Sequence, residues 1–225
     1  QNKRDLTIAE AKRLAELFNI SLDGLLHERE VMVTVNVVKD DVPKPKNVVP
    51  DEMRISVPQN KVDKFKEVLL YILNRIGGQP NVGETVIYKL LYFIDFDYYE
   101  LYETQLIGAK YIKNHHGPTP VIFTKIAAEM KKNGEIIEVK SKYFQYLQKK
   151  YLPVRQARLE RLSAQELEVI NSVIRRLGYK TAKELSEYSH ADVPWITATD
   201  GEAIDYEAVF YRTSPYSVRK YPDDL

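Results

Sequence analysis

The stretch that decides the fold is ETVIYKLLYFIDFDYYELYE, residues 84–103. Its apolar side chains repeat at helical spacing, and the segment is much more apolar than the other helices that the sequence predicts. A helix with so few polar positions is normally buried by its neighbours. We therefore expect residues 84–103 to form the central, largely buried helix of a mainly helical domain.

One face of this helix carries an aspartate among tyrosines. Tyr88, Tyr92, Asp95, Tyr99 and Tyr102 follow spacings of three and four, which places them on the same side of a helix. A buried carboxylate is costly unless donors bind it. Tyrosine hydroxyls, a histidine, or backbone amides of the 114–120 turn can supply those donors. We interpret Asp95 as a structural hydrogen-bond acceptor rather than as a catalytic group.

The rest of residues 59–225 is expected to form one mixed domain around this helix. Gly77-Gly78 ends the preceding helix, and Thr119 is expected to cap a third helix with Pro120 in its first turn. Two capping boxes open later helices, and the tail after Trp195 is expected to be irregular. The remaining expected elements are helices at 62–76, 119–133, 163–178 and 181–189, a strand at 105–113, a tight turn at 114–120, and β structure at 135–152.

The first 58 residues differ in character from this domain. Residues 1–30 predict two short helices, and residues 31–58 predict either two edge strands around a proline-rich loop or an extended linker. The predicted fold class is therefore α+β: a small all-α head remnant, a β linker, and a mainly helical domain with a small β element at 59–225.

The composition limits the possible classes of function. Hydrophobic residues make up 44% of the 225 and charged residues 29%, as in ordinary globular proteins, and the net charge is +1. The absence of cysteine excludes disulfides, thiolate metal sites and a cysteine nucleophile. No apolar segment reaches the ~20 residues that span a bilayer. We expect a cytoplasmic protein without a membrane partner.

The head resembles the last two helices of Cro/repressor-like (Xre-type) helix-turn-helix domains, on the string RDLT…AELFNISLDGLL at residues 4–26. That resemblance implies operator DNA as a partner, bound through the complete head, and dimers, because such heads usually pair. The recognition helix would precede Gln1, so we expect the chain to be part of a longer protein. The candidates for contact with the DNA backbone are Gln1, Asn2, Lys3 and Arg4.

Several short motifs in the large domain together resemble the Panacea (SocA-like) antitoxin domain over roughly residues 60–215. They are KLLYFID at 89–95, GAKY at 108–111, HGPTP at 116–120, and the LS, SH and PW pairs at 185–195. The residues that carry the resemblance are Lys89, Leu90, Leu91, Tyr92, Phe93, Asp95, Gly108, Tyr111, His116, Gly117, Pro118, Pro120, Ser189, His190, Pro194 and Trp195.

The resemblance implies an antitoxin that neutralises a cognate protein toxin by direct binding and represses its own operon through an attached DNA-binding head. It implies no catalytic residue and no cofactor. It is compatible with a homodimer or a toxin–antitoxin heterotetramer, and the family adds a Clp-type protease as a further candidate partner.

Three histidines raise the question of a metal or a catalytic site. His115, His116 and His190 could ligate zinc with Asp95 or Asp97, but the spacing matches no standard zinc site, so we predict no metal. Ser189-His190 resembles a nucleophile and its base only in sequence, because helical neighbours point about 100° apart. We expect this pair to close its helix against Trp195.

A basic segment runs from about 131 to 161, interleaved with the aromatic residues Tyr143, Phe144, Tyr146 and Tyr151. It could hold RNA or an acidic surface of a toxin, or be a solvated hairpin. Its candidate partner-binding residues are Lys140, Lys142, Lys149, Lys150, Arg155 and Arg158. Two rival functions remain at this point: a regulator that senses a ligand or another partner, and a hydrolase that uses Asp95, His116 and His190.

Overall fold

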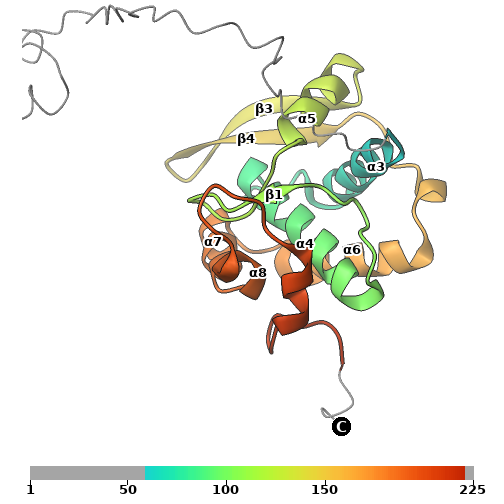
Figure 1. Ribbon diagram of the computed structural model, residues 1–225. Coiled ribbons are helices and arrows are strands. Elements are labelled where there is room, and N and C mark those ends of the chain that lie inside the picture. The colour runs from blue at the N-terminus through green and yellow to red at the C-terminus, as the bar shows by residue number, and fades with distance from the viewer. Residues whose placement is uncertain (1–58, 221–225) are drawn as a thin grey trace, which may run out of the picture. The chain divides into compact units, whose positions relative to one another are not determined.

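The computed structural model describes residues 59–220. The predicted head at 1–30, including the DNA-backbone candidates at 1–4, and the linker at 31–58 lie outside the described residues. Within the described part, helices α3 to α8 pack together, and two small antiparallel sheets lie among and beside them (Figure 1). The α+β class is therefore confirmed. None of the described helices is long and apolar enough to cross a membrane.

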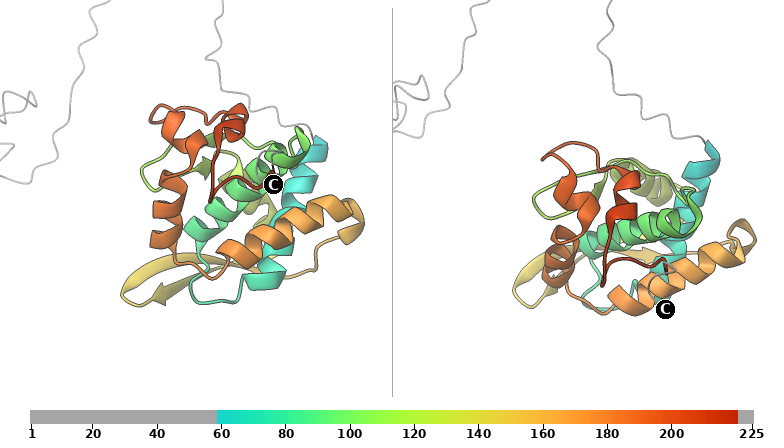
Figure 2. Two further views of the ribbon diagram at one scale, coloured as in Figure 1. Left: turned by 90° about the horizontal axis from the view of Figure 1, so that it is seen from below. Right: turned by 60° about the horizontal axis from the view of Figure 1, so that its bottom comes forward.

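The central helix is α4, Glu84–Tyr102, which confirms the prediction for this segment. Most of its side chains between Val86 and Glu100 are buried. The elements that pack against it are α6 (Ala164–Leu177), α7 (Ala182–His190), β2 (Thr119–Pro120), β4 (Tyr146–Pro153) and the 3₁₀ helix η2 (Tyr206–Tyr211), and Figure 2 shows helices on several sides of it. Glu103 ends α4 in the left-handed conformation (φ 57°), and its N–H donates to the carbonyl of Tyr99.

Helices α3, α6 and α7 begin and end close to where the sequence predicts, whereas α8 and η1 were not predicted. Helix α3, Gln59–Ile76, ends at Gly77, and both capping boxes are present, at Ser163 before α6 (Ala164–Leu177) and at Thr181 before α7 (Ala182–His190). Helix α8, Val193–Thr197, follows after one short turn and has Pro194 in its first turn. The short 3₁₀ helix η1, Leu159–Arg161, precedes α6.

Residues 105–122 differ from the prediction. A strand was expected over 105–113, but only β1, Tyr111–Ile112, is extended and paired. Its partner is β2, Thr119–Pro120, in the segment that was expected to start a helix. Thr119 donates its hydroxyl to the carbonyl of Gly117 instead of capping a helix, and α5 begins later, over Phe123–Lys132.

The tail after Trp195 contains more structure than predicted. The 3₁₀ helix η2, Tyr206–Tyr211, packs on α4 and α8, and Val209 is completely buried. Sequence periodicity misses this element because six residues in 3₁₀ geometry give neither a helical nor a strand repeat.

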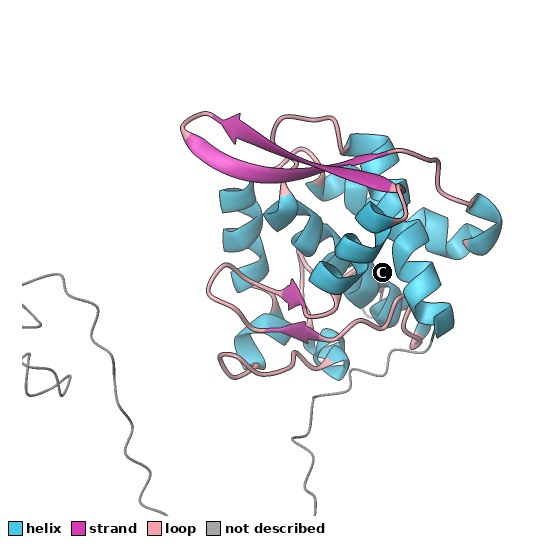
Figure 3. Cartoon of the chain, turned by 90° about the horizontal axis from the view of Figure 1, so that it is seen from above, coloured by secondary structure: helices cyan, strands magenta, loops and turns pink. Residues whose placement is uncertain are grey.

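The predicted β structure at 135–152 is a hairpin. Strand β3, Ile136–Tyr143, pairs with β4, Tyr146–Pro153, through a two-residue turn. The base of the hairpin packs on α3 and α5, and its twisted tip extends beyond the helices (Figure 3).

Candidate functional site

Asp95 lies in the interior, with its carboxylate bound by donors on two segments. Oδ1 accepts the backbone N–H groups of Ile107 (2.8 Å) and Gly108 (3.1 Å). Oδ2 accepts the N–H of Ala109 (3.1 Å) and the hydroxyl of Tyr206 (2.7 Å). Asp95 therefore ties the loop after α4 and the helix η2 to the centre of the domain.

This arrangement confirms part of the expectation for Asp95. A tyrosine hydroxyl binds it, as predicted, but the amides come from residues 107–109 rather than from the 114–120 turn, and no histidine contributes. Gly108 has φ +67°, and this left-handed turn aims successive amides at one carboxylate. Complete burial raises the pKa of Asp95, while the bonds from Tyr206 and the three amides oppose that rise.

A second buried network, centred on Arg212, was not found from the sequence. The guanidinium binds both carboxylate oxygens of Asp192 (2.8 and 2.5 Å) and also Asp97 (2.9 Å) and Glu100 (3.0 Å). The hydroxyl of Tyr92 donates to the same Asp192 carboxylate (2.8 Å). The network fixes the end of η2 and the α7–α8 junction to α4.

The electrostatics of this network depend on desolvation. Burial raises the pKa of Asp97 to about 6, although Arg212 and Arg176 both favour its charged form. Three carboxylates share the charge of one fully buried guanidinium, with Arg176 binding Asp97 from the other side. Arg212 and the three carboxylates that it binds are buried and bound to one another, as expected for a structural network.

Three of the short motifs, KLLYF, HGPTP and SH, pack against one another in the structure. Lys89 is buried and donates to the carbonyl of Pro118 (3.1 Å). Gly117 has φ +95°, and a Cβ there would come within 2.5 Å of the hydroxyl of Ser189 and 2.7 Å of Cε of Lys89. Only glycine allows this approach, and the KLLYF, HGPTP and SH motifs are therefore neighbours in space.

Other motif residues also serve packing. The ring of His190 stacks on Trp195 with centroids 4.2 Å apart, as expected for the end of α7. Tyr111 contacts the ring of Tyr92 and donates its hydroxyl to the carbonyl of Leu91 (3.0 Å). Leu90 and Phe93 are buried in the core, and Pro120 pairs with Tyr111 in the small sheet.

Ser189 and His190 do not form a nucleophile and base. The hydroxyl of Ser189 donates to the carbonyl of Ser186 (2.9 Å), and burial together with nearby cations lowers the pKa of His190. His190 lines an open cavity of about 590 Å³ with Lys113 and Trp195, but neither Asp95 nor His116 lines it. The three residues of the hydrolase hypothesis are thus not gathered around one cavity.

No metal site accompanies these histidines. Among residues 59–220, no group of three or more histidine, aspartate or glutamate side chains is arranged so that it could hold a metal ion.

The buried amine of Lys89 gives a prediction for pH dependence. Burial lowers its pKa from 10.5 to about 7, so between these values the unfolded chain binds a proton that the folded chain does not. The free energy of unfolding then rises with pH, by up to about 1.4 kcal/mol per unit. Urea unfolding at pH 7.5 and 9 should show this rise, and Lys89→Met should remove it.

The matched control for that experiment is Lys132→Met, at an exposed position in the last turn of α5. It should keep the wild-type slope. A Lys89→Met variant with the wild-type slope would mean that the amine stays charged in the folded protein.

The predicted basic patch is only partly available to a partner. Lys150 is nearly buried and donates to the carbonyls of Gln79 (2.7 Å) and Gly78 (3.4 Å). Lys149 pairs with Glu84 (3.2 Å) but remains exposed. Lys140 and Lys142 are exposed on β3.

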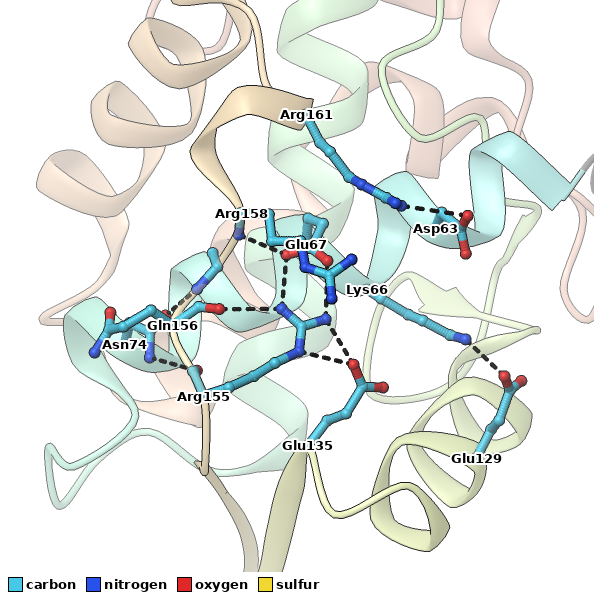
Figure 4. A network of polar contacts seen from close by, with 11 residues as sticks. Asp63, Lys66, Glu67, Asn74, Glu129, Glu135, Arg155, Gln156, Arg158 and Arg161 are labelled. Atoms are coloured by element: carbon cyan, nitrogen blue, oxygen red, sulfur yellow. Dashed lines mark hydrogen bonds and ion pairs between the residues drawn. The ribbon is translucent and has the colours of Figure 1, made fainter.

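The side chain of one arginine of the patch, and the backbone of the other, belong to an internal network (Figure 4). Arg155 binds Glu67 and Glu135 through its guanidinium (2.8 and 2.6 Å), and the backbone N–H of Arg158 donates to Glu67 (2.7 Å). Glu67 is buried, so Arg155 neutralises an interior carboxylate. Within the patch, Lys150 and Arg155 are thus bound by internal acceptors, and the exposed residues are Lys140, Lys142, Lys149 and Arg158.

The sequence places Phe144 and Tyr146 among the basic residues, but it does not show that they lie exposed, with Leu147, at the tip of the hairpin. Phe144, Tyr146 and Leu147 are 83%, 69% and 78% exposed. Alternation along β3 and β4 indicates strands, but it cannot show that this end of the hairpin extends away from the core.

Comparison with known proteins gives one match. The search of the curated proteins and the search of the solved structures found none. The family model described as "Antitoxin SocA-like, Panacea domain" matches residues 87–196, a little under half of the chain. This segment contains every motif residue named above, from Lys89 to Trp195. Residues 87–196 are thus similar to the SocA-like Panacea antitoxin domain.

Proposed function

We propose that this chain is the antitoxin of a toxin–antitoxin pair and that it neutralises a cognate protein toxin by direct binding. The observation that carries the proposal is the match of residues 87–196 to the SocA-like Panacea antitoxin domain. The internal roles of the motif residues support it. They build a rigid framework, which suits a protein that acts through its surface.

The geometry gives less support to the rivals. A hydrolase that uses Asp95 needs the carboxylate at an open site, whereas Asp95 is completely buried and bound by three amides. For a regulator that senses a different partner, the discriminating observation is whether the neighbouring gene encodes a toxic protein.

Autoregulation is part of the same proposal. The resemblance of residues 1–30 to a Cro/repressor-like head supports binding of operator DNA through the complete head, with the large domain left to bind the toxin.

Growth rescue tests the proposed function. Expression of the neighbouring gene alone should stop growth, and co-expression of this chain should restore it. A neighbouring product that is harmless, or that kills equally with and without the chain, would refute the antitoxin assignment.

A shortened chain tests the division of labour between the two parts. The motif residues all lie between Lys89 and Trp195, so a chain that begins at Val57 should rescue growth as well as the full chain does. If the shortened chain folds, shown by a cooperative thermal transition, but does not rescue, then residues 1–56 take part in neutralisation.

A further inference from the structure

We propose that the tip of the β3–β4 hairpin, together with the groove beneath it, is the surface that binds the toxin. The toxin surface that fits it has an apolar ridge bordered by carboxylates. This inference rests on the proposed function and adds the site and the chemistry of the partner. We call Tyr143, Phe144, Tyr146 and Leu147 the hairpin tip.

The hairpin tip exposes apolar side chains next to one another. Phe144, Tyr146 and Leu147 each leave more than two thirds of their surface in water. Single exposed apolar residues are common on soluble proteins, but a contiguous cluster usually marks an interaction site. The tip extends beyond the helices in both views of Figure 2, so a partner can reach it without rearrangement of the core.

The backbone at Phe144 is strained. It has φ 54°, in the left-handed region that glycine and asparagine occupy readily and that aromatic residues seldom adopt. Such a conformation is unfavourable for a residue with a bulky side chain. An exposed phenylalanine at this position gains nothing from the core that offsets the strain. The ring packs edge-on against Tyr143, with centroids 4.7 Å apart, and the rest of its surface is open to a partner.

A groove of about 540 Å³ lies between the hairpin tip and the helical body. The hairpin tip forms one wall, and the starts of α4 and α7, with Thr85 and Ala182, form the other. Beside the groove, β4 is tied to the body by a hydrogen bond from the amide of Gln148 to the carbonyl of Pro80 (2.6 Å) and by one from the hydroxyl of Tyr151 to Glu84. These bonds hold the hairpin against the start of α4 before a partner binds, which lowers the entropic cost of binding.

Charges at the rim of the groove select the partner. Lys149 and Lys183 line the groove, and the strand register places the exposed Lys140 and Lys142 opposite Lys149 and Leu147. Within the described part of the chain, Lys140 and Lys142 form no ion pair, and Lys183 pairs with Glu187 only at 3.9 Å. The nearby carboxylates are already bound, Glu84 by Lys149 and Glu138 by Lys131. This side of the hairpin therefore carries more positive than negative charge, through Lys140 and Lys142, and that excess complements carboxylates beside the ridge.

The same features fit a protein better than RNA. A single-strand site combines stacking rings with a continuous basic track. Here the rim lysines border an apolar groove that contains Leu147 and Ala182, and the chain as a whole has a net charge of only +1.

The test uses the full chain with the double substitution Phe144→Gly/Leu147→Ser. Glycine relieves the strained φ, so the variant should melt no lower than wild type. Calorimetric titration with the purified toxic product of the neighbouring gene should show binding weakened at least tenfold. The control is Tyr211→Ser, which removes an equally exposed aromatic ring (77%) from η2, away from the groove, and should bind like wild type.

The possible outcomes separate this proposal from the proposed function. If wild type binds and the double variant binds equally well, the docking site is wrong and the antitoxin function stands. If wild type does not bind the toxic product, the proposed function fails and the docking site fails with it. If a labelled 20-nucleotide poly(U) binds wild type and loses affinity in the double variant, the surface is an RNA site, and the protein partner is the wrong assignment.

Discussion

Arg212→Met should lower the free energy of unfolding by about 3–5 kcal/mol, the usual cost of removing one partner from a buried ion pair. The guanidinium has no exposed side-chain surface, and it binds Asp97, Glu100 and Asp192. Methionine fills much of the same space but leaves these carboxylates without their shared cation. Urea unfolding followed by circular dichroism measures the loss.

The control for this experiment is Arg161→Met. Arg161 pairs with Asp63 at 3.3 Å, and both side chains are partly exposed. An exposed pair contributes about 1 kcal/mol or less. Equal stability losses in the two variants would show that the Arg212 network adds nothing beyond an ordinary surface pair.

Asp95→Asn is expected to destabilise the domain by about 1–3 kcal/mol, the penalty for a mismatched buried polar group. An asparagine keeps one acceptor oxygen for the amides of Ile107 and Gly108, but its NH₂ then faces the N–H of Ala109. Thermal unfolding should show a lower midpoint. Neutralisation should weaken at 37 °C and recover at lower temperature, because the defect lies in folding.

Tyr206→Phe provides the comparison for Asp95→Asn. It removes one donor to Asp95 and leaves the amides in place, so its effect should be the smaller of the two. If Asp95→Asn is as stable as wild type yet fails to neutralise, then Asp95 acts in a functional site and the structural interpretation is wrong.

The helices were predictable because their signals are local. The apolar repeat of residues 84–103, the capping boxes at Ser163 and Thr181, and the Gly77-Gly78 stop each specify a boundary within a few residues of chain. The hairpin followed from the same kind of local pattern.

The errors arose where long-range contacts override local preference. Thr119-Pro120 has the composition of a helix start, yet the pairing with Tyr111 and Ile112 holds it extended. Residues 107–109 do not join a sheet because their amides bind Asp95. Arg212 and the carboxylates that it binds lie 20 to 115 residues apart, so no sequence pattern links them.

The candidate site was predictable only in part for the same reason. The basic character of residues 131–161 is visible in the sequence, but the loss of Lys150 and Arg155 to internal acceptors depends on tertiary packing. The exposure of Phe144 and Leu147 likewise depends on where the core ends along the hairpin.

Direct, stoichiometric binding to the toxin is the central claim, and the mass of the complex tests it most directly. The full chain and the purified toxic product of the neighbouring gene are mixed at equal concentration and passed over a size-exclusion column with light scattering. We predict one peak that contains both proteins in a fixed ratio. Two separate peaks, each with the mass of the unmixed protein, would contradict the account, even if the chain still rescues growth.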